Sequence, residues 1–305
     1  MKIFVTGVNG QLGHDVINEL TRRRQNCIGS DITAVYAGIA DNSAVTKAPY
    51  IGIDITDSAQ VMNALNEIQP DTVIHCAAFT KVDLAEDKPE ICWSVNVDGT
   101  YNIAKACRAI DASMIYISTD YVFPGTGTDP YEPEDAYNPI SVYGITKLAG
   151  ELAVKSLLQR FFIVRTAWVF GLNGSNFVKT MLNVAKTHDT VRVVNDQIGT
   201  PTYTPDLARL LCDMVETEKY GTYHATNEGG YISWYDFTCE IYRQAGLDTT
   251  VVPVTTEEYG LSKANRPKNS RLSKKCLAEN FAVLPEWKDA LQRYLKEIQY
   301  DKDNQ

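Results

Sequence analysis

The sequence predicts an α/β fold in which a doubly wound parallel sheet carries a smaller α+β lobe. Over the first 170 residues, short β-rich apolar runs alternate with longer helical patterns, and the first run leads directly into a glycine-rich turn. Strands that alternate with helices form right-handed βαβ crossovers and hence a parallel sheet. The expected strands span 2–6, 26–30, 50–55, 72–76, 113–118 and 161–166, and the expected helices span 11–24, 58–68, 90–110 and 141–159.

The pattern becomes less regular after residue 170. We expect residues 1–170 to form the sheet domain and residues 171–305 to form mainly the lobe, interleaved with the end of the sheet. The segment 33–49 is rich in small residues and lacks periodicity, which predicts a surface loop. In the second part, helices are expected near 175–187, 205–217, 233–245 and 286–299, and short strands near 191–194, 221–225 and 250–254.

The composition predicts a cytoplasmic globular protein. Hydrophobic residues make up 44% and charged residues 22% of the chain, which is ordinary globular usage. No run reaches the roughly 18 apolar residues of a membrane helix, and the opening turns glycine-rich before a secretory apolar region develops. We therefore expect no membrane partner.

Charge and cysteine usage exclude further classes of function. The formal net charge is −9, whereas a nucleic-acid partner requires a basic face for counterion release. The seven cysteines are scattered and contain no Cys-x-x-Cys pair, so they are interpreted as ordinary thiols. No metal-ligand cluster of recognisable spacing occurs. We therefore expect neither a nucleic-acid partner nor a metal.

The first turn of the sheet has the spacing Gly-x-x-Gly-x-x-Gly. Glycines at these positions permit a tight turn, a close approach of the backbone to a pyrophosphate, and close packing of the helix on the strand. The helix that follows attracts negative charge at its N-terminus. The turn therefore predicts a dinucleotide site, with Gly7, Asn9, Gly10, Gln11, Leu12 and Gly13 as cofactor-binding candidates.

Residues after the next three strands are candidates for the rest of this site. Asp31 follows the second strand, where an acid can accept hydrogen bonds from the adenosine ribose hydroxyls. A carboxylate there would repel the phosphate of NADPH, so Asp31 favours NADH; a loop-capping residue is the alternative interpretation. Asp54 and Ile55 are candidates beside the adenine. The small residues after the fourth strand, expected beside the cofactor backbone, are Ala77, Ala78, Phe79 and Thr80.

A catalytic set is predicted from Thr119, Tyr143 and Lys147. Tyr143 and Lys147 are four residues apart and therefore share one face of a helix. A lysine ammonium near the phenol would lower the pKa of Tyr143 and make it a general acid around neutral pH. Thr119, at the end of the fifth strand, can hold a substrate carbonyl by its hydroxyl. A Tyr-x-x-x-Lys pair alone is equally typical of an ordinary amphipathic helix, and its position after a nucleotide-binding turn favours the catalytic interpretation.

At these residues the sequence resembles the extended short-chain dehydrogenases, whose nucleotide-binding domain is of the Rossmann type. Within them it closely resembles the dTDP-4-dehydrorhamnose reductases. The matching segments span nearly the whole chain: TGVNGQLG (6–13), HCAAFTKVDLAE (75–86), STDYVFPG (118–125), VYGITKLAGE (142–151), VRTAWVFG (164–171), NDQIGTPTYTPDLA (195–208) and RPKNSRL (266–272).

The resemblance implies a reaction and a set of site residues. NADPH or NADH would deliver hydride to carbon 4 of dTDP-4-dehydro-L-rhamnose, with Tyr143 as the proton donor, and the product would be dTDP-L-rhamnose. Lys147 would also bind the nicotinamide ribose. The implied assembly is a candidate homodimer, and some relatives carry a divalent metal at that interface. The substrate-binding candidates are Thr119, Asp120, Tyr121, Trp168 and Arg266, the last near the diphosphate or in a solvated basic loop.

Other functions of the same fold stay open at this stage. A dehydratase is disfavoured, because its glutamate after the active-site aspartate is replaced here by Tyr121. An NAD-dependent nucleotide-sugar epimerase would use the same Tyr-Lys pair. A noncatalytic regulatory subunit is a third alternative, although the intact Thr119, Tyr143 and Lys147 set argues against it.

Overall fold

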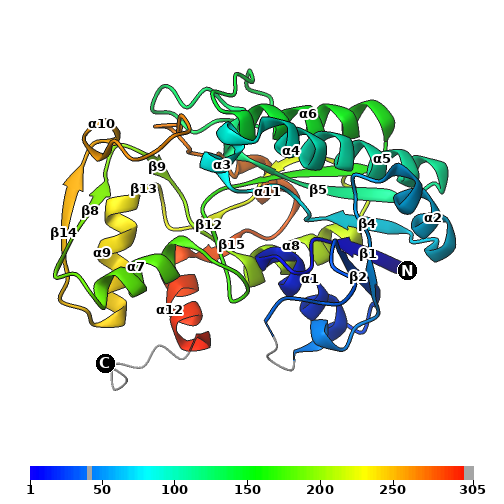
Figure 1. The fold of residues 1–305 in the computed structure, drawn as a ribbon, viewed down its shortest axis with the longest axis horizontal. Coiled ribbons are helices and arrows are strands. Elements are labelled where there is room, and N and C mark those ends of the chain that lie inside the picture. Colours follow the sequence, from blue (N-terminus) through cyan, green and yellow to red (C-terminus); the bar gives the residue numbers. More distant parts are fainter. Residues whose placement is uncertain (40–42, 299–305) are drawn as a thin grey trace.

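The computed structural model describes residues 1–39 and 43–298 and contains a central parallel sheet of seven strands. Its strand order is β11-β6-β5-β4-β1-β2-β3, and every neighbouring pair is parallel (Figure 1). The predicted fold class is thereby confirmed. The strands are β1 (Lys2–Thr6), β2 (Asn26–Asp31), β3 (Tyr50–Gly52), β4 (Thr72–His75), β5 (Ser113–Thr119), β6 (Phe161–Thr166) and β11 (Gly221–His224).

Helices cover both faces of this sheet, as Figure 1 shows. Alternate residues of a strand point to opposite faces, so β1 contributes to two cores. Ile3 and Val5 pack with α1 and α8, whereas Phe4 packs with α2, α5 and α6. The helices on the two faces are α1 (Gln11–Arg22) and α8 (Thr204–Val215) on one, and α2 (Ser58–Ile68), α5 (Thr100–Ala109) and α6 (Val142–Leu157) on the other.

The second part of the chain forms a lobe and also completes the sheet. Its core includes Phe170, Phe237 and Tyr294. The edge strand β11 and the helix α8 come from this part but pack with the sheet. The main lobe elements are α7 (Phe177–Ala185), β8 (Thr190–Val194), α9 (Trp234–Ala245), β14 (Thr250–Val254) and α12 (Trp287–Glu297).

Short elements connect the lobe to the sheet. Three short strand pairs form outside the central sheet: β7 with β10, β9 with β13, and β12 with β15. Their bounds and those of the short helices are β7 (Val169–Phe170), β9 (Ile198–Gly199), β10 (Thr202–Tyr203), β12 (Asn227–Glu228), β13 (Ile232–Ser233), β15 (Leu284–Glu286), α10 (Thr256–Tyr259) and α11 (Lys275–Asn280).

Several boundaries differ from those expected. The third strand ends at Gly52, and the chain turns so that 53–55 lines a cavity. The expected helix 90–110 is composite: α4 (Pro89–Trp93) leads through the π-helical segment η2 (Ser94–Gly99) into α5, and α3 (Val82–Asp87) precedes it. In the expected loop 33–49, a 3₁₀ turn forms at Ala44–Thr46, and residues 40–42 lie outside the described part.

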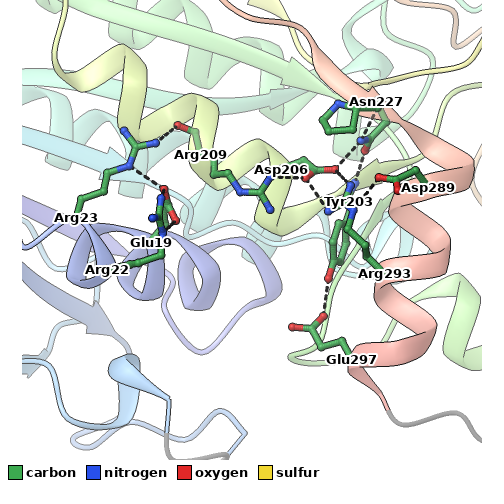
Figure 2. Close-up of polar contacts among 11 residues, drawn as sticks. Glu19, Arg22, Arg23, Tyr203, Asp206, Arg209, Asn227, Asp289, Arg293 and Glu297 are labelled. Carbon is green, nitrogen blue, oxygen red and sulfur yellow. Dashed lines mark hydrogen bonds and ion pairs between the residues drawn. The ribbon is translucent and has the colours of Figure 1, made fainter.

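A polar cluster fixes the last described helix to α8 (Figure 2). The fully buried carboxylate of Asp206 accepts two bonds from Arg293, of 2.9 and 2.7 Å. It also accepts bonds from Arg209 at 3.0 Å and from the Asn227 amide at 2.8 Å. These donors come from α12, α8 and β12, so one carboxylate ties the lobe to the helical layer of the sheet.

Two further findings apply to residues 1–39 and 43–298. No helix in this part is long and apolar enough to cross a membrane. No group of three or more His, Cys, Asp or Glu side chains in it could hold a metal ion.

Candidate active site

A cavity of about 1060 Å³ opens at the carboxyl ends of the sheet strands. Ligands of open α/β sheets bind at this edge. Of the predicted site residues, Arg266 is the one that does not line it. The residues that do are Gly7, Asn9, Gly10, Gln11, Leu12, Gly13, Asp31, Asp54, Ile55, Ala77, Ala78, Phe79, Thr80, Thr119, Asp120, Tyr121, Tyr143, Lys147 and Trp168.

The glycine turn, residues 7–13, lines part of this cavity and approaches neighbouring backbone closely. Gly7 has a φ of +75°, and a Cβ added there would lie 2.5 Å from the backbone nitrogen of Ala77. A Cβ at Gly13 would overlap the carbonyl of Gly7. The α1 helix starts at Gln11, and its N-cap residue Gly10 has no side chain to cap it, which leaves the first N–H groups of the helix for another acceptor. This space and these donors fit a pyrophosphate.

The predicted acids Asp31 and Asp54, which line this cavity, already have protein partners. Asp31 accepts bonds from the backbone N–H groups of Asn9, at 2.9 Å, and Ile32, at 2.8 Å. Asp54 accepts bonds from the backbone and hydroxyl of Thr56. These bonds fix the orientation of both carboxylates beside the cavity.

A lobe residue that sequence reasoning missed holds the glycine turn from outside. Asn173 is buried, and its amide donates to the carbonyl of Asn9 at 2.8 Å and to that of Gly10 at 3.2 Å. Its oxygen accepts a bond from the N–H of Ile39 at 3.0 Å. The asparagine occurs in a Gly- and Asn-rich connection, where such residues usually indicate only a turn. The structure gives it a second role as a clamp on the turn.

Asn173→Ala is expected to weaken dinucleotide binding. The substitution removes the donor that holds two carbonyls of the turn, and a hydrogen bond of this kind contributes about 1 kcal/mol. We expect the Kd for NADH or NADPH to rise by about tenfold, as measured by calorimetry. Asn183→Ala, at an exposed position of α7, is the control. An unchanged Kd in a folded Asn173→Ala protein would contradict the clamp.

The predicted catalytic side chains meet between β5 and α6. Ser141 caps α6 by accepting a bond from the N–H of Gly144 at 3.2 Å, so the helix starts immediately before Tyr143. Thr119 ends β5 and lines the cavity together with Tyr143. Lys147 is buried one turn further along. All three side chains line the same cavity.

The electrostatics of this set differ from the expectation. Burial raises the pKa of Tyr143 above its ordinary value instead of lowering it, so the sequence-based expectation was wrong on this point. The physical reason is desolvation, which disfavours phenolate. Burial likewise lowers the pKa of Lys147 to about 7. The Lys147 amine donates to the carbonyl of Ile117 at 2.7 Å and lies 4.0 Å from the ring centroid of Tyr116.

Asp120 lies in the wall of the cavity, but both of its oxygens are engaged. The Thr119 hydroxyl donates to one oxygen at 2.9 Å, and the Ser270 hydroxyl donates to the other. Burial raises the pKa of this carboxyl to about 6. Ser270 was not predicted as a site residue, because it is 150 positions away in the sequence.

Trp168 belongs to a stacked aromatic wall. Its ring lies parallel to that of Trp234, with a centroid separation of 3.7 Å and an interplanar angle of 15°. Its φ of +50° is unusual for a residue with a side chain, and such strain persists only where the surroundings fix it. A Cβ added at Gly199 would lie only 2.9 Å from the indole of Trp168, so glycine at this position leaves room for that ring. Trp234, which sequence reasoning missed, therefore holds Trp168 rigidly at the cavity.

Arg266 lies beside the cavity rim and is paired within the protein. Its guanidinium donates to Asp83 at 2.6 Å and to the Tyr121 hydroxyl at 3.3 Å. These bonds join the segment before Ser270 to α3.

Comparisons with known proteins agree with this arrangement. The family model of the RmlD substrate binding domain matches residues 1–300. The dTDP-4-dehydrorhamnose reductase of Streptomyces griseus is 40% identical over 295 residues, which cover 94% of this chain and 91% of that protein.

Solved structures show the same similarity. A dTDP-4-dehydrorhamnose reductase from Clostridium acetobutylicum ATCC 824 has a TM-score of 0.89 and 42% identity, with coverage of 98% of this chain and 100% of that one. The corresponding reductase from Bacillus anthracis, solved in complex with NADP, has a TM-score of 0.87 and 38% identity, with coverage of 97% and 99%. The chain therefore belongs to the family of the RmlD substrate binding domain and the dTDP-4-dehydrorhamnose reductases.

Proposed function

We propose that the protein reduces the carbon-4 ketone of dTDP-4-dehydro-L-rhamnose to dTDP-L-rhamnose, in nucleotide-sugar and cell-surface polysaccharide biosynthesis. The observation that carries this proposal is one cavity that joins the glycine turn to Thr119, Tyr143 and Lys147. The relatives named above are reductases of this kind. The glycine turn and the catalytic set supply the two halves of such a site.

In this proposal the protein provides the proton and the alignment. The reduced nicotinamide, when bound, supplies a hydride to carbon 4. Tyr143, whose raised pKa keeps it protonated at neutral pH, donates a proton to the ketone oxygen. Lys147, one helical turn away, stabilises the charge left on the phenol. The hydride and the proton together convert the ketone to an alcohol, and no carboxylate base is required.

The sugar is proposed to bind against the wall opposite the glycine turn. Trp168, supported by Trp234, offers an apolar surface there. Tyr121 lies edge-on to Tyr143, with a centroid separation of 5.5 Å. Asp120 acts on the substrate through Thr119, because its own oxygens are engaged. Arg266 would reach the diphosphate only by leaving its bonds to Asp83 and Tyr121.

NADH is the proposed preferred coenzyme, although a relative binds NADP. Asp31 stands at the position where a ribose is expected, and the basic residues that line the cavity are Lys81 and Lys147, neither of which is adjacent to β2 in the sequence. A ribose phosphate there would face a carboxylate, and none of the described residues that line the cavity near Asp31 is a cation. Like charges about 5 Å apart near a protein surface repel by about 3 kcal/mol.

Asp31→Asn is therefore expected to shift the coenzyme preference. The ratio of kcat/KM for NADH to that for NADPH should fall by about tenfold or more, because the substitution removes the repelling charge. Steady-state kinetics with both coenzymes measure this ratio. Glu67→Gln, on the exposed surface of α2, should leave it unchanged. A wild-type preference for NADPH would contradict the assignment of Asp31.

The proposal also covers the location of the protein, the roles of the two parts of the chain, and its oligomeric state. We propose a cytoplasmic protein whose partner is the dTDP-linked keto-sugar and not a nucleic acid, as the net charge of −9 favours. Residues 1–170 would bind the coenzyme, and residues 171–305 would mainly hold the sugar. A homodimer is supported by apolar side chains exposed on α4, α5 and α6, which are Ile91, Trp93, Tyr101, Ile145 and Leu152.

The proposed activity is tested by coenzyme oxidation at 340 nm with enzymatically generated dTDP-4-dehydro-L-rhamnose. We expect oxidation that depends on both the sugar and the protein. If the protein binds either coenzyme but oxidises neither in the presence of this sugar, the reductase assignment is wrong.

A further inference from the structure

Ser270 reaches the catalytic set from a distant part of the chain and is firmly placed there. Its backbone N–H donates to the carbonyl of Ile198 at 2.8 Å, and the N–H of Ile198 donates to the carbonyl of Lys268 at 2.9 Å. The side chain of Asn269 donates to the carbonyls of Thr126 and Asp129. Ser270 itself is 4% exposed. Its hydroxyl therefore has a fixed position against Asp120.

The donors and acceptors around Thr119 set the direction of its hydroxyl proton. The backbone N–H of Tyr121, which can only donate, lies 3.2 Å from the Thr119 oxygen and occupies one lone pair. An ionised Asp120 can only accept, so the Thr119 proton points toward it at 2.9 Å. The second lone pair of the Thr119 oxygen is then available to accept a hydrogen bond from the neighbouring hydroxyl of Tyr143.

This geometry has a consequence for the proton donor. While Asp120 is ionised, the oxygen of Thr119 can accept the phenol proton of Tyr143 in the free protein, which holds that hydroxyl in position until the ketone oxygen of the substrate replaces Thr119 as its acceptor. When Asp120 is protonated, its carboxyl no longer holds the proton of Thr119. That proton can then turn toward Tyr143, where it competes with the phenol proton for the space between the two oxygens. The orientation of the Tyr143 hydroxyl thus depends on the groups that keep the Asp120 carboxyl ionised.

We propose that Ser270 is a positioning residue for the reduction: by donating to Asp120 it stabilises the carboxylate that orients Thr119, and Thr119 in turn orients the hydroxyl of Tyr143. The expected change in kcat rests on the proposed function, because it requires that the protein reduces the keto-sugar. The two bonds to Asp120, from Ser270 and from Thr119, are independent of the substrate.

The titratable neighbours of Asp120 determine the direction of the expected pH effect. Tyr121 and Tyr143 face it, and both are neutral near pH 7 because burial raises their pKa values. Burial raises the pKa of Asp120 to about 6, while the bonds from Ser270 and Thr119 lower it. Loss of the Ser270 hydroxyl therefore raises this pKa further. A hydrogen bond to a charged group corresponds to about a tenfold change in the protonation equilibrium, which is about one pH unit.

The kinetic test compares Ser270→Ala with Ser270→Thr. In Ser270→Ala, the acidic limb of the kcat profile should move up by about one pH unit, so that kcat falls about fivefold at pH 6 and much less at pH 8. Ser270→Thr keeps the hydroxyl and should restore the wild-type limb. Ser273→Ala, in the same segment, is the control. An equal loss of kcat at every pH, or no rescue by threonine, would show a merely structural role.

A second readout separates this proposal from the proposed function. With ¹³Cγ-labelled aspartate, the carboxyl resonance of Asp120, identified by its loss in Asp120→Asn, reports the pKa directly. It should titrate about one pH unit higher in Ser270→Ala than in the wild type. If the wild type does not turn over the keto-sugar but this shift occurs, the proposed function fails while the effect of Ser270 on the ionisation of Asp120 stands. An unshifted titration overturns the role of Ser270.

Discussion

Tyr143→Phe is expected to lower kcat by about 10²- to 10⁴-fold, the usual contribution of a positioned general acid. The substitution removes the hydroxyl that donates the proton and keeps the ring. Its edge-on packing with Tyr121 is therefore retained, and the fold and coenzyme binding should change little. The measurements are steady-state kinetics with the keto-sugar, and the Kd of the coenzyme by calorimetry.

A matched control for this variant is Tyr259→Phe. Tyr259 ends α10 and does not line the cavity, so the loss of its hydroxyl should leave kcat at the wild-type value. If Tyr143→Phe retains more than about a tenth of wild-type kcat, another group donates the proton. Thr119, the nearest hydroxyl of the set, would then be the next candidate.

Arg165→Met is expected to destabilise the fold by about 3–5 kcal/mol, the range for breaking a buried ion pair by removing one partner. Arg165 and Glu151 are both fully buried, and two bonds of 2.8 and 2.7 Å join them. The same carboxylate accepts a bond from Ser118 on β5 at 2.6 Å. The variant leaves Glu151 charged and without its cation. Equilibrium denaturant unfolding measures the loss.

Two further variants separate this effect from simple loss of side-chain volume. The double variant Glu151→Gln with Arg165→Met removes both charges and should be more stable than Arg165→Met alone. Arg160→Met breaks an exposed pair with Asp111 and should cost less than about 1 kcal/mol. Equal losses for Arg165→Met and Arg160→Met would contradict the account of the buried pair.

The sheet and its turn were predictable because their signals are local. The strand-helix alternation and the glycine spacing each lie within a few residues, so the positions of Gly7 and Tyr143 followed from the sequence. The end of β3 at Gly52 was not predictable, because the apolar pattern continues through Ile53 and Ile55. Those two side chains are buried against other parts of the fold and not in the strand.

The missed site residues share a different cause. Asn173, Trp234 and Ser270 act through contacts with residues that are distant in the sequence, and each has an ordinary local interpretation as a turn or helix-end residue. Burial explains the error in the pKa of Tyr143. The Tyr-x-x-x-Lys spacing indicates which side chains meet, but it does not show how much solvent they lose.

The central claim is tested most directly by following the hydrogen transferred to the sugar. We would incubate the protein with dTDP-4-dehydro-L-rhamnose and a reduced coenzyme in which both hydrogens at carbon 4 of the nicotinamide are deuterium, and analyse the product by mass spectrometry and NMR. The account predicts one deuterium at carbon 4 of the sugar for each coenzyme oxidised. A rearranged sugar without deuterium and without net oxidation of the coenzyme would indicate an epimerase and contradict the account.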